Sequence, residues 1–325
     1  MTNKAHKVAG RIVALLVLFA VCVGFGAIYL NRQYISDYVR YRSFTPTSEI
    51  AQIAVRVGLT DDGRFRAYSA EPGIYKADEF NQFCGAAETE VNVLGCYTND
   101  KIYIYDVSNA EISGIKEVTL VHEMLHADYA RLGGGDLEAV NNALDGYAKQ
   151  HADSLRGHMA NYSAEDRYTE LYSVLGTEYS GLPEHLETRY SKLFNRDAVL
   201  ELYEGYIKKF NDIKERANEI VEEGNALATD ITNQSAAYSE AVNQLNSEID
   251  VLNGQIESGN ITRVEFENRQ AAITAEVNRL SALRTEIEQK IERYNSLVAE
   301  LEQLELQSKK LDDSINSKLG EPNKY

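Results

Sequence analysis

The C-terminal third of the chain carries a repeat that permits few folds. Between about residues 206 and 319 the sequence contains no proline, and apolar residues recur at alternating steps of four and three. This is the heptad spacing of coiled coils. The repeating positions are Ile213, Ala217, Ile220, Gly224, Leu227, Ile231, Tyr238, Val242, Leu245, Ile249, Leu252 and Ile256, and then Ile273, Val277, Leu280, Ile287, Ile291, Tyr294, Val298 and Leu301. The extra step of four between the sets that end at Ile231 and begin at Tyr238 predicts a local unwinding of the supercoil.

A turn signal separates the two halves of this repeat. Ser258, Gly259 and Asn260 are followed by Thr262 and, three residues later, by a glutamate, which is the spacing of a helix-capping box. We therefore predict that residues 206–325 form an antiparallel coiled-coil hairpin with two arms of ~75 Å each. The alternative is one long parallel dimer, which the break at Gly259 disfavours.

An uncharged apolar run occupies residues 12–30. At ~1.5 Å per residue, a helix of this length spans a hydrocarbon core of ~30 Å. We interpret the run as one transmembrane helix, so that residues 1–45 comprise a cytoplasmic tail, the anchor and a juxtamembrane stretch. Basic residues flank both ends of the run, so the positive-inside rule favours a cytoplasmic N-terminus by a small margin. The alternative is a cleaved signal peptide, because Gly24, Gly26 and Ala27 offer a cleavage site.

Cysteine spacing and net charge narrow the setting of the remaining chain. Cys84 and Cys96 are twelve residues apart, a spacing that a loop or hairpin can close as a disulfide. Such a bond places the domain in an oxidising compartment, outside the membrane, whereas two free buried thiols are the alternative. The net charge of -17 argues against nucleic acid as a partner, because phosphate binding needs clustered Lys and Arg.

Residues 46–205 have the mixed pattern of a globular domain. A helix is expected from Ser48, capped by Ser48 or Thr47 and stopped at Gly58. The alternating run at residues 101–107 predicts a strand that forms one arm of a hairpin. Helical spacing follows from Ile115, and further helices are expected near residues 137–158 and 164–175. The prediction is an α+β domain that is mainly helical with a small sheet.

One of these helices carries the motif "HEMLH". Residues four apart lie on one face of a helix, so His122 and His126 can present two imidazoles to one metal ion. Glu123 lies beside them, where a carboxylate can take a proton from a metal-activated water and pass it to a leaving amine. The motif therefore predicts a zinc site with its own general base.

The motif resembles that of the zincin superfamily of zinc metallopeptidases, in which a substrate-pairing strand precedes the HExxH helix. The metzincin pattern requires glycine and histidine where this chain has Tyr129 and Leu132, which excludes that subclass. Gluzincins take a glutamate from a later helix. Glu170, which follows His126 by 44 residues, is similar in position to the ligand of lethal-factor-type peptidases. Those enzymes carry a second glutamate where this chain has Val174.

The resemblance implies a role for each residue. His122, His126 and Glu170 would bind Zn²⁺, Glu123 would act as base and then acid, and Tyr162 would stabilise the oxyanion. Other residues compete for two of these roles. The rival third ligands are Glu178, His151 and His158, and the rival tyrosines are Tyr168 and Tyr172.

Two functions are consistent with these patterns. The first is a membrane-anchored, extracytoplasmic zinc endopeptidase that cleaves a protein or peptide and contacts a protein partner through its coiled coil. The second is a cell-surface structural or adhesion protein in which the zincin-like domain is a scaffold. The intact HExxH motif favours the first, because a scaffold has no physical need for Glu123 between two ligands.

Overall fold

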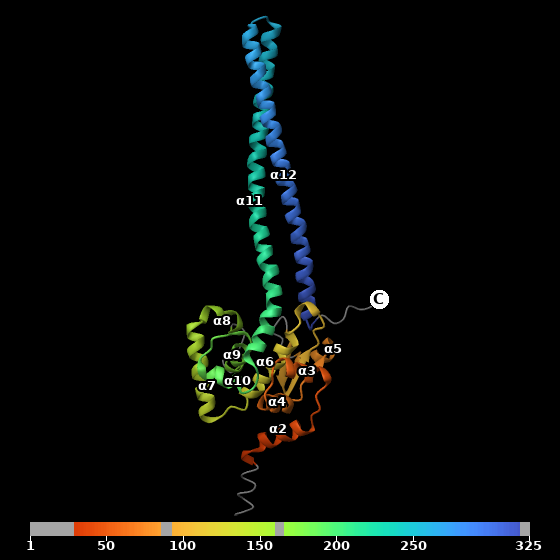
Figure 1. Ribbon diagram of the computed structural model, residues 1–325, viewed down its shortest axis with the longest axis vertical. Helices are drawn as coiled ribbons and strands as arrows, with labels where there is room; N and C mark the ends of the chain where they lie inside the picture. The colour runs from red at the N-terminus through yellow and green to blue at the C-terminus, as the bar shows by residue number, and fades with distance from the viewer. Residues whose placement is uncertain (1–28, 86–92, 160–165, 319–325) are drawn as a thin grey trace, which may run out of the picture. The chain divides into compact units, whose positions relative to one another are not determined.

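The structure is a computed structural model that describes residues 29–85, 93–159 and 166–318 (Figure 1). These residues form two compact units. Unit 1 contains the described residues up to Lys209 together with those from Leu311 onward, and unit 2 is Phe210–Lys310. The elements in chain order are α2 (Arg32–Ser43), α3 (Ser48–Arg56), α4 (Asp61–Ser69), β1 (Gly73–Tyr75), α5 (Ala77–Cys84), β2 (Gly95–Thr98), β3 (Lys101–Tyr105), η1 (Ala110–Ile112), α6 (Ile115–Tyr129), α7 (Gly134–Gln150), α8 (Ala152–Met159), α9 (Arg167–Glu178), α10 (Glu184–Ser191), α11 (Arg196–Glu257) and α12 (Arg263–Ile315).

The described part of unit 1 is mainly helical with a mixed sheet of three strands, in the order β1-β3-β2. β1 runs parallel to β3, and β2 pairs with it antiparallel in the register Cys96↔Tyr103. Asn99 and Asp100 connect β2 to β3, and both have positive φ angles, as the two-residue turns favoured in hairpins require. The predicted strand and its hairpin are confirmed.

A disulfide joins Cys84 at the end of α5 to Cys96 in β2. It lies next to a small apolar cluster whose members are Phe80, Cys84, Val93 and Tyr103. The predicted bond is confirmed, and it supports an oxidising, extracytoplasmic setting for this unit.

α6 is the central helix of unit 1. It contacts α3, α4, α9 and the strands β2 and β3. Leu120, Val121, Met124 and Leu125 are fully buried on one side of the helix, and Ile115, Thr119, Glu123 and Ala127 are buried on the other, so nearly the whole circumference is covered. A helix in this position is held on several sides, and the side chains it carries are fixed in direction.

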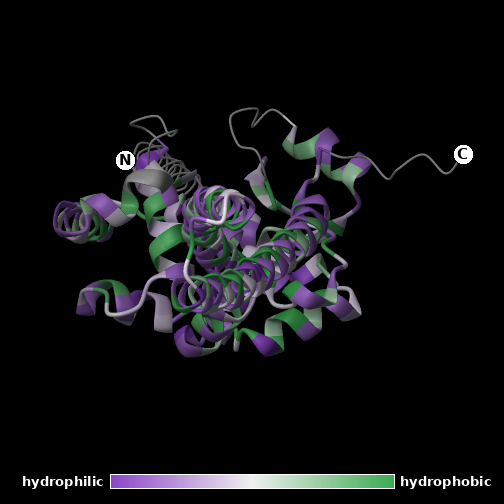
Figure 2. Cartoon of the chain, turned by 90° about the horizontal axis from the view of Figure 1, so that it is seen from above, coloured by the Kyte–Doolittle hydropathy of each residue, from purple (hydrophilic) through white to green (hydrophobic). Residues whose placement is uncertain are grey.

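Unit 2 is a pair of antiparallel helices, formed by most of α11 and α12. The cross-helix hydrogen bonds Arg216–Glu300, Arg293–Glu223 and Gln234–Glu286 join residues 84, 70 and 52 positions apart, and these separations shrink toward the turn. Gly259 has a positive φ in that turn. Thr262 and Glu265 exchange the two hydrogen bonds of a capping box. The predicted helical hairpin is confirmed, and Figure 2 shows the hydrophilic and hydrophobic residues alternating around its helices.

The buried seam of α12 agrees with the prediction at Leu280 and Ile287, which are buried, and differs from it at other positions. Val277, Ile291 and Val298 are 41–47% exposed, whereas Leu297 and Leu311, which the repeat did not include, are buried. Leu297 and Val298 are neighbours, so spacing alone cannot say which of them faces α11. Contact with α11 places the leucine side inward.

The predicted transmembrane run falls almost wholly on residues 12–28, which lie outside the described residues. Among residues 29–85, 93–159 and 166–318, no helix is both long and apolar enough to cross a membrane.

The sequence places the start of the coiled coil at residue 206. In the structure the chain passes from unit 1 to unit 2 between Lys209 and Phe210, inside α11, and returns at Leu311.

Candidate metal site

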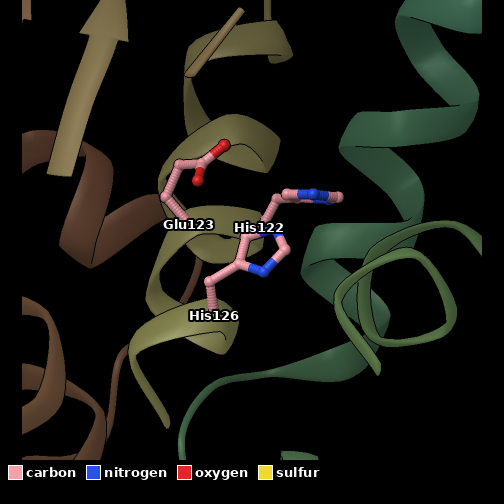
Figure 3. A group of neighbouring side chains, drawn as sticks. All are labelled: His122, Glu123 and His126. Atoms are coloured by element: carbon pink, nitrogen blue, oxygen red, sulfur yellow. The ribbon is translucent and has the colours of Figure 1, made fainter. Parts of the chain in front are cut away.

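His122, Glu123 and His126 form a group that could hold a metal ion. One ligand atom of each lies within 4.8 Å of the others, and the two imidazole centroids are 4.9 Å apart. Figure 3 shows the imidazoles next to each other on one side of α6, with the Glu123 carboxylate projecting from a neighbouring side. The i, i+4 spacing produces this arrangement directly.

Glu170 of α9 faces both histidines. Its Oε1 atom lies 3.6 Å from His122 Nε2, and its Oε2 atom lies 3.4 Å from His126 Nε2. Burial alone would lower the pKa of His122, but the Glu170 carboxylate, with smaller contributions from Glu123 and Glu178, outweighs burial and raises that pKa above its usual value. Burial would raise the pKa of Glu170, and the two histidines instead hold it far below its usual range. The three side chains therefore form a mutually attractive cluster that a cation can enter in place of protons.

Close packing of α9 on α6 brings Glu170 to this position. Gly176 lies so near α6 that a β-carbon there would come within 2.3 Å of Leu125 Cδ1. Leu171, Val174 and Leu175 are buried along the same helix. The approach at Gly176 therefore fixes the distance of α9 from the two histidines.

Thr169 supports one of the imidazoles from outside the cluster. Its hydroxyl lies 2.9 Å from His126 Nδ1. When Nδ1–H donates to this oxygen, Nε2 keeps its lone pair for a cation that lies between it and Glu170. A partner of this kind orients a metal-binding histidine, and the sequence motif gives no sign of it.

Glu123 is 5% exposed and lies against strand β2. A β-carbon at Gly95 would come within 2.7 Å of Glu123 Oε1 and 2.6 Å of Thr119 Cγ2. Gly95 thus leaves the room that the carboxylate occupies. β2 is at the edge of the described sheet, so Glu123 sits between the two histidines and an edge strand.

Comparison with protein-family models, with curated proteins and with solved structures found no match. A chemical role for this chain must therefore be argued from the buried HExxH-like group and its surroundings.

The structure places the rival residues as follows. The ring of His151 stacks on Tyr147 with centroids 4.0 Å apart, and His151 is exposed at the end of α7. The side chain of His158 lies outside the described residues, as does Tyr162.

Two rival tyrosines have hydroxyls bonded elsewhere. The Tyr168 hydroxyl donates to Asp145, and that of the fully buried Tyr172 donates to Asp128. Burial raises the pKa of Tyr172 well above its ordinary value, and the Asp128 carboxylate adds to the shift. Neither hydroxyl is bonded to the cluster around His122, and the role assigned to Tyr162 stays a prediction.

Glu178 is the last residue of α9 and adds to the negative charge around His122. Burial, together with the charge of Glu178 and a hydrogen bond to it, raises the pKa of Tyr203. Tyr203 lies near the start of α11, far from the motif in sequence, and no local pattern links it to the site. The sequence identified Glu178 as a rival ligand but missed this carboxylate–phenol pair.

Proposed function

We propose that the protein is a zinc-dependent endopeptidase of the gluzincin type, anchored in a membrane with its catalytic unit on the extracytoplasmic side. His122, His126 and Glu170 hold the zinc ion, and Glu123 is the general base and acid. The observation that carries the proposal is the position of the Glu170 carboxylate opposite both Nε2 atoms.

The donor set fits zinc in chemistry and in size. Two imidazole nitrogens and one carboxylate are a ligand set of catalytic zinc sites. Ligand atoms ~2.0–2.1 Å from a tetrahedral zinc lie roughly 3.3–3.4 Å from each other. The carboxylate oxygens of Glu170 lie 3.6 and 3.4 Å from the Nε2 atoms of the two histidines, close to this distance between ligand atoms. Small side-chain adjustments therefore suffice for zinc to bind.

The surroundings of Glu123 suit proton transfer. Bound zinc supplies Lewis-acid chemistry, since it polarises a peptide carbonyl and makes water acidic enough to lose a proton near neutral pH. The Glu123 carboxylate, held between the histidines and β2, accepts that proton and delivers it to the amine of the leaving peptide. Burial of Glu123 against Gly95 of β2 restricts the positions that the carboxylate can take.

The edge strand β2 offers a place for an extended peptide. Leu94 O accepts a hydrogen bond from Tyr105 N, so Leu94 faces β3. In an antiparallel pair, alternate residues direct their N–H and C=O groups to opposite sides of the strand. The backbone groups of Gly95 and Tyr97 in β2 therefore point away from β3, to the outer edge of the sheet. A peptide that pairs with this edge passes next to Glu123. This supports an unfolded or loop segment of a protein as the substrate.

The test is metal content and cleavage in the same preparation. We expect the purified chain to contain one zinc per molecule by elemental analysis and to cleave members of a peptide library. Glu123→Gln should keep the zinc and lose cleavage, because the amide cannot accept the proton. Glu170→Ala should lose most of the zinc, while His151→Ala, which changes a histidine outside the cluster, should keep it.

Three outcomes would count against the proposal. If Glu170→Ala retained its zinc, Glu170 could not be the third ligand. If the purified chain contained iron in place of zinc, the proposed zinc chemistry would be wrong. Stoichiometric zinc without cleavage of any peptide would favour the scaffold or adhesion function instead.

A further inference from the structure

Helix α2 has two faces of different kinds. On the inner face Asp37 is 2% exposed, and the ring of Tyr41 lies 5.3 Å from that of Phe65 in α4. On the outer face Ile35, Tyr38 and Val39 are 42%, 49% and 59% exposed. At roughly 100° per residue, these three side chains fall within one third of the helix circumference. Large apolar side chains gathered in this way on a surface indicate a binding face.

The arginines and tyrosines around the outer face of α2 indicate which kind of partner this face binds. Arg32 and Arg42 lie on the same side of α2, and Tyr29 and Tyr34 are 66% and 61% exposed at its start. Asp37 is the only acidic residue of the helix, and it is buried. A chain with net charge -17 thus has a locally basic, tyrosine-rich surface here. Tyrosines and arginines around an apolar strip are typical of the membrane interface, where anionic headgroups attract cations.

The sequence before α2 brings this face to a membrane. The uncharged apolar run at residues 12–30 ends two positions before the first residue of α2. We propose that α2 is an interfacial helix, which lies along the surface of a lipid bilayer with Ile35, Tyr38 and Val39 inserted at the level of the headgroups.

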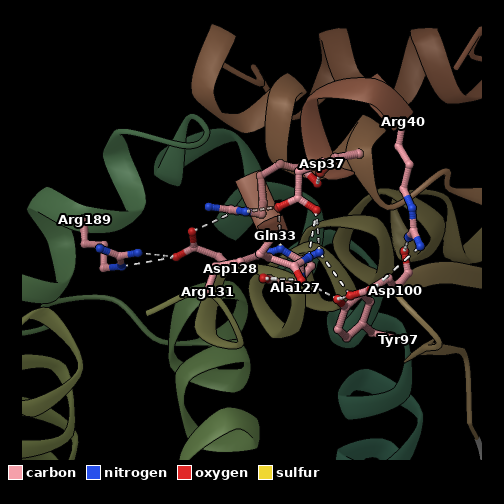
Figure 4. Close-up of polar contacts among 11 residues, drawn as sticks. Gln33, Asp37, Arg40, Tyr97, Asp100, Ala127, Asp128, Arg131 and Arg189 are labelled. Atoms are coloured by element: carbon pink, nitrogen blue, oxygen red, sulfur yellow. Dashed lines mark hydrogen bonds and ion pairs between the residues drawn. The ribbon is translucent and has the colours of Figure 1, made fainter. Parts of the chain in front are cut away.

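The inner face of α2 is joined to the metal-site helix (Figure 4). Asp37 accepts hydrogen bonds of 2.9 Å from both Nε and Nη2 of Arg131, which follows α6 by two residues. Arg66 of α4 lies 3.5 Å from Asp37 and 3.2 Å from Asp128 of α6. Buried charge pairs of this kind resist separation, because an unpaired charge left inside is costly. Contact of α2 with lipid therefore fixes how the metal site faces the membrane.

The absence of tryptophan from the sequence allows a direct test. We introduce a single reporter as Val39→Trp or Ile35→Trp in the full chain, reconstituted in nanodiscs of phosphatidylcholine and phosphatidylglycerol. A fraction of the lipid carries bromine either close to the headgroup or near the chain end. We expect a blue-shifted emission that shallow bromines quench more strongly than deep ones.

Two control variants separate the outer face from its surroundings. Tyr41→Trp places the reporter on the opposite face of α2, and Val55→Trp places it at a 71% exposed position of α3. Both should be quenched much less than Val39→Trp. Emission of Val39→Trp at the wavelength of water-exposed tryptophan, without quenching, would overturn the proposal. Blue-shifted emission that no brominated lipid quenches would also overturn it, since a second copy or another protein would then cover the face. Peptide cleavage is not a readout, so the result is independent of the proposed activity.

Discussion

Gly95 determines how closely strand β2 can approach the Glu123 carboxylate. Gly95→Ala would place a methyl group 2.7 Å from Glu123 Oε1, so the carboxylate or the strand has to move. Because a displacement of ~1 Å in a catalytic group can reduce the rate about a hundredfold, we expect a loss of peptide cleavage of that order. Zinc content should not change, since neither histidine is displaced. Cleavage rate and metal content are measured on the same sample.

Gly146→Ala is the matched control for this change. A β-carbon at Gly146 meets nothing within 4 Å, and alanine is the better helix former. Cleavage should be unaffected in this variant. Equal cleavage by both variants would show that the position of Glu123 beside Gly95 does not matter for the reaction.

Thr169 contacts a histidine of the proposed zinc site. Thr169→Val removes the hydroxyl that lies 2.9 Å from His126 Nδ1, and the loss of such a partner typically lowers metal affinity by about 10–100-fold. Competition with a zinc-binding dye measures the change. Thr169→Ser retains the hydroxyl and should bind zinc as the wild type does. If serine and valine gave the same affinity, packing rather than the hydrogen bond would explain the effect.

Substitutions at two neighbouring residues of α12 test which side of this helix is buried. Leu297 is 1% exposed and Val298 is 41% exposed. Leu297→Ala should lower the free energy of unfolding by about 2–5 kcal/mol through lost burial and a cavity. Val298→Ala should change it by roughly 0.5 kcal/mol or less. Chemical denaturation followed by circular dichroism reports both, and a larger loss at Val298 would restore the seam predicted from the heptads.

The helices that local signals define could be predicted, while contacts between distant elements could not. The capping box at Thr262, the turn glycine Gly259 and the i, i+4 pair His122 and His126 each depend on residues a few positions apart. The choice of Glu170 over Glu178 as the residue opposite both histidines depends on how α9 packs on α6. The helical repeat of apolar residues shows which side of each helix is buried, but it does not show how the two helices pack against each other.

The same limit applies to the partners of the site. Thr169 belongs to a different helix from the histidine it contacts, and Gly95 lies in a strand 28 positions before Glu123 in the sequence. Residues 63–84 are rich in turn-forming residues and show no clear helical or strand period, and the structure has most of α4, β1 and α5 there. Short elements of this kind are held by their neighbours rather than by their own propensities.

On the scale of the whole molecule, zinc should stabilise one unit and leave the other unchanged. His122, His126 and Glu170 all belong to unit 1, whereas Phe210–Lys310 contains none of them. A ligand that binds only the folded state stabilises the unit that holds it. After chelation, we expect faster hydrogen exchange in α6 and α9 by mass spectrometry, with no change across residues 220–300. Equal changes in both units would contradict this.

Both arms of the hairpin continue into unit 1. α11 begins there at Arg196, and the chain that returns from Leu311 is held by hydrogen bonds from Asn81 to Ser317 O and between Asn109 and Ser314. A single proteolytic cut at the Gly259 turn would therefore yield two polypeptides that remain one particle. The shorter, C-terminal fragment would keep its hydrogen bonds to Asn81 and Asn109 in unit 1. The protein could therefore be produced as two separately expressed fragments that reassemble.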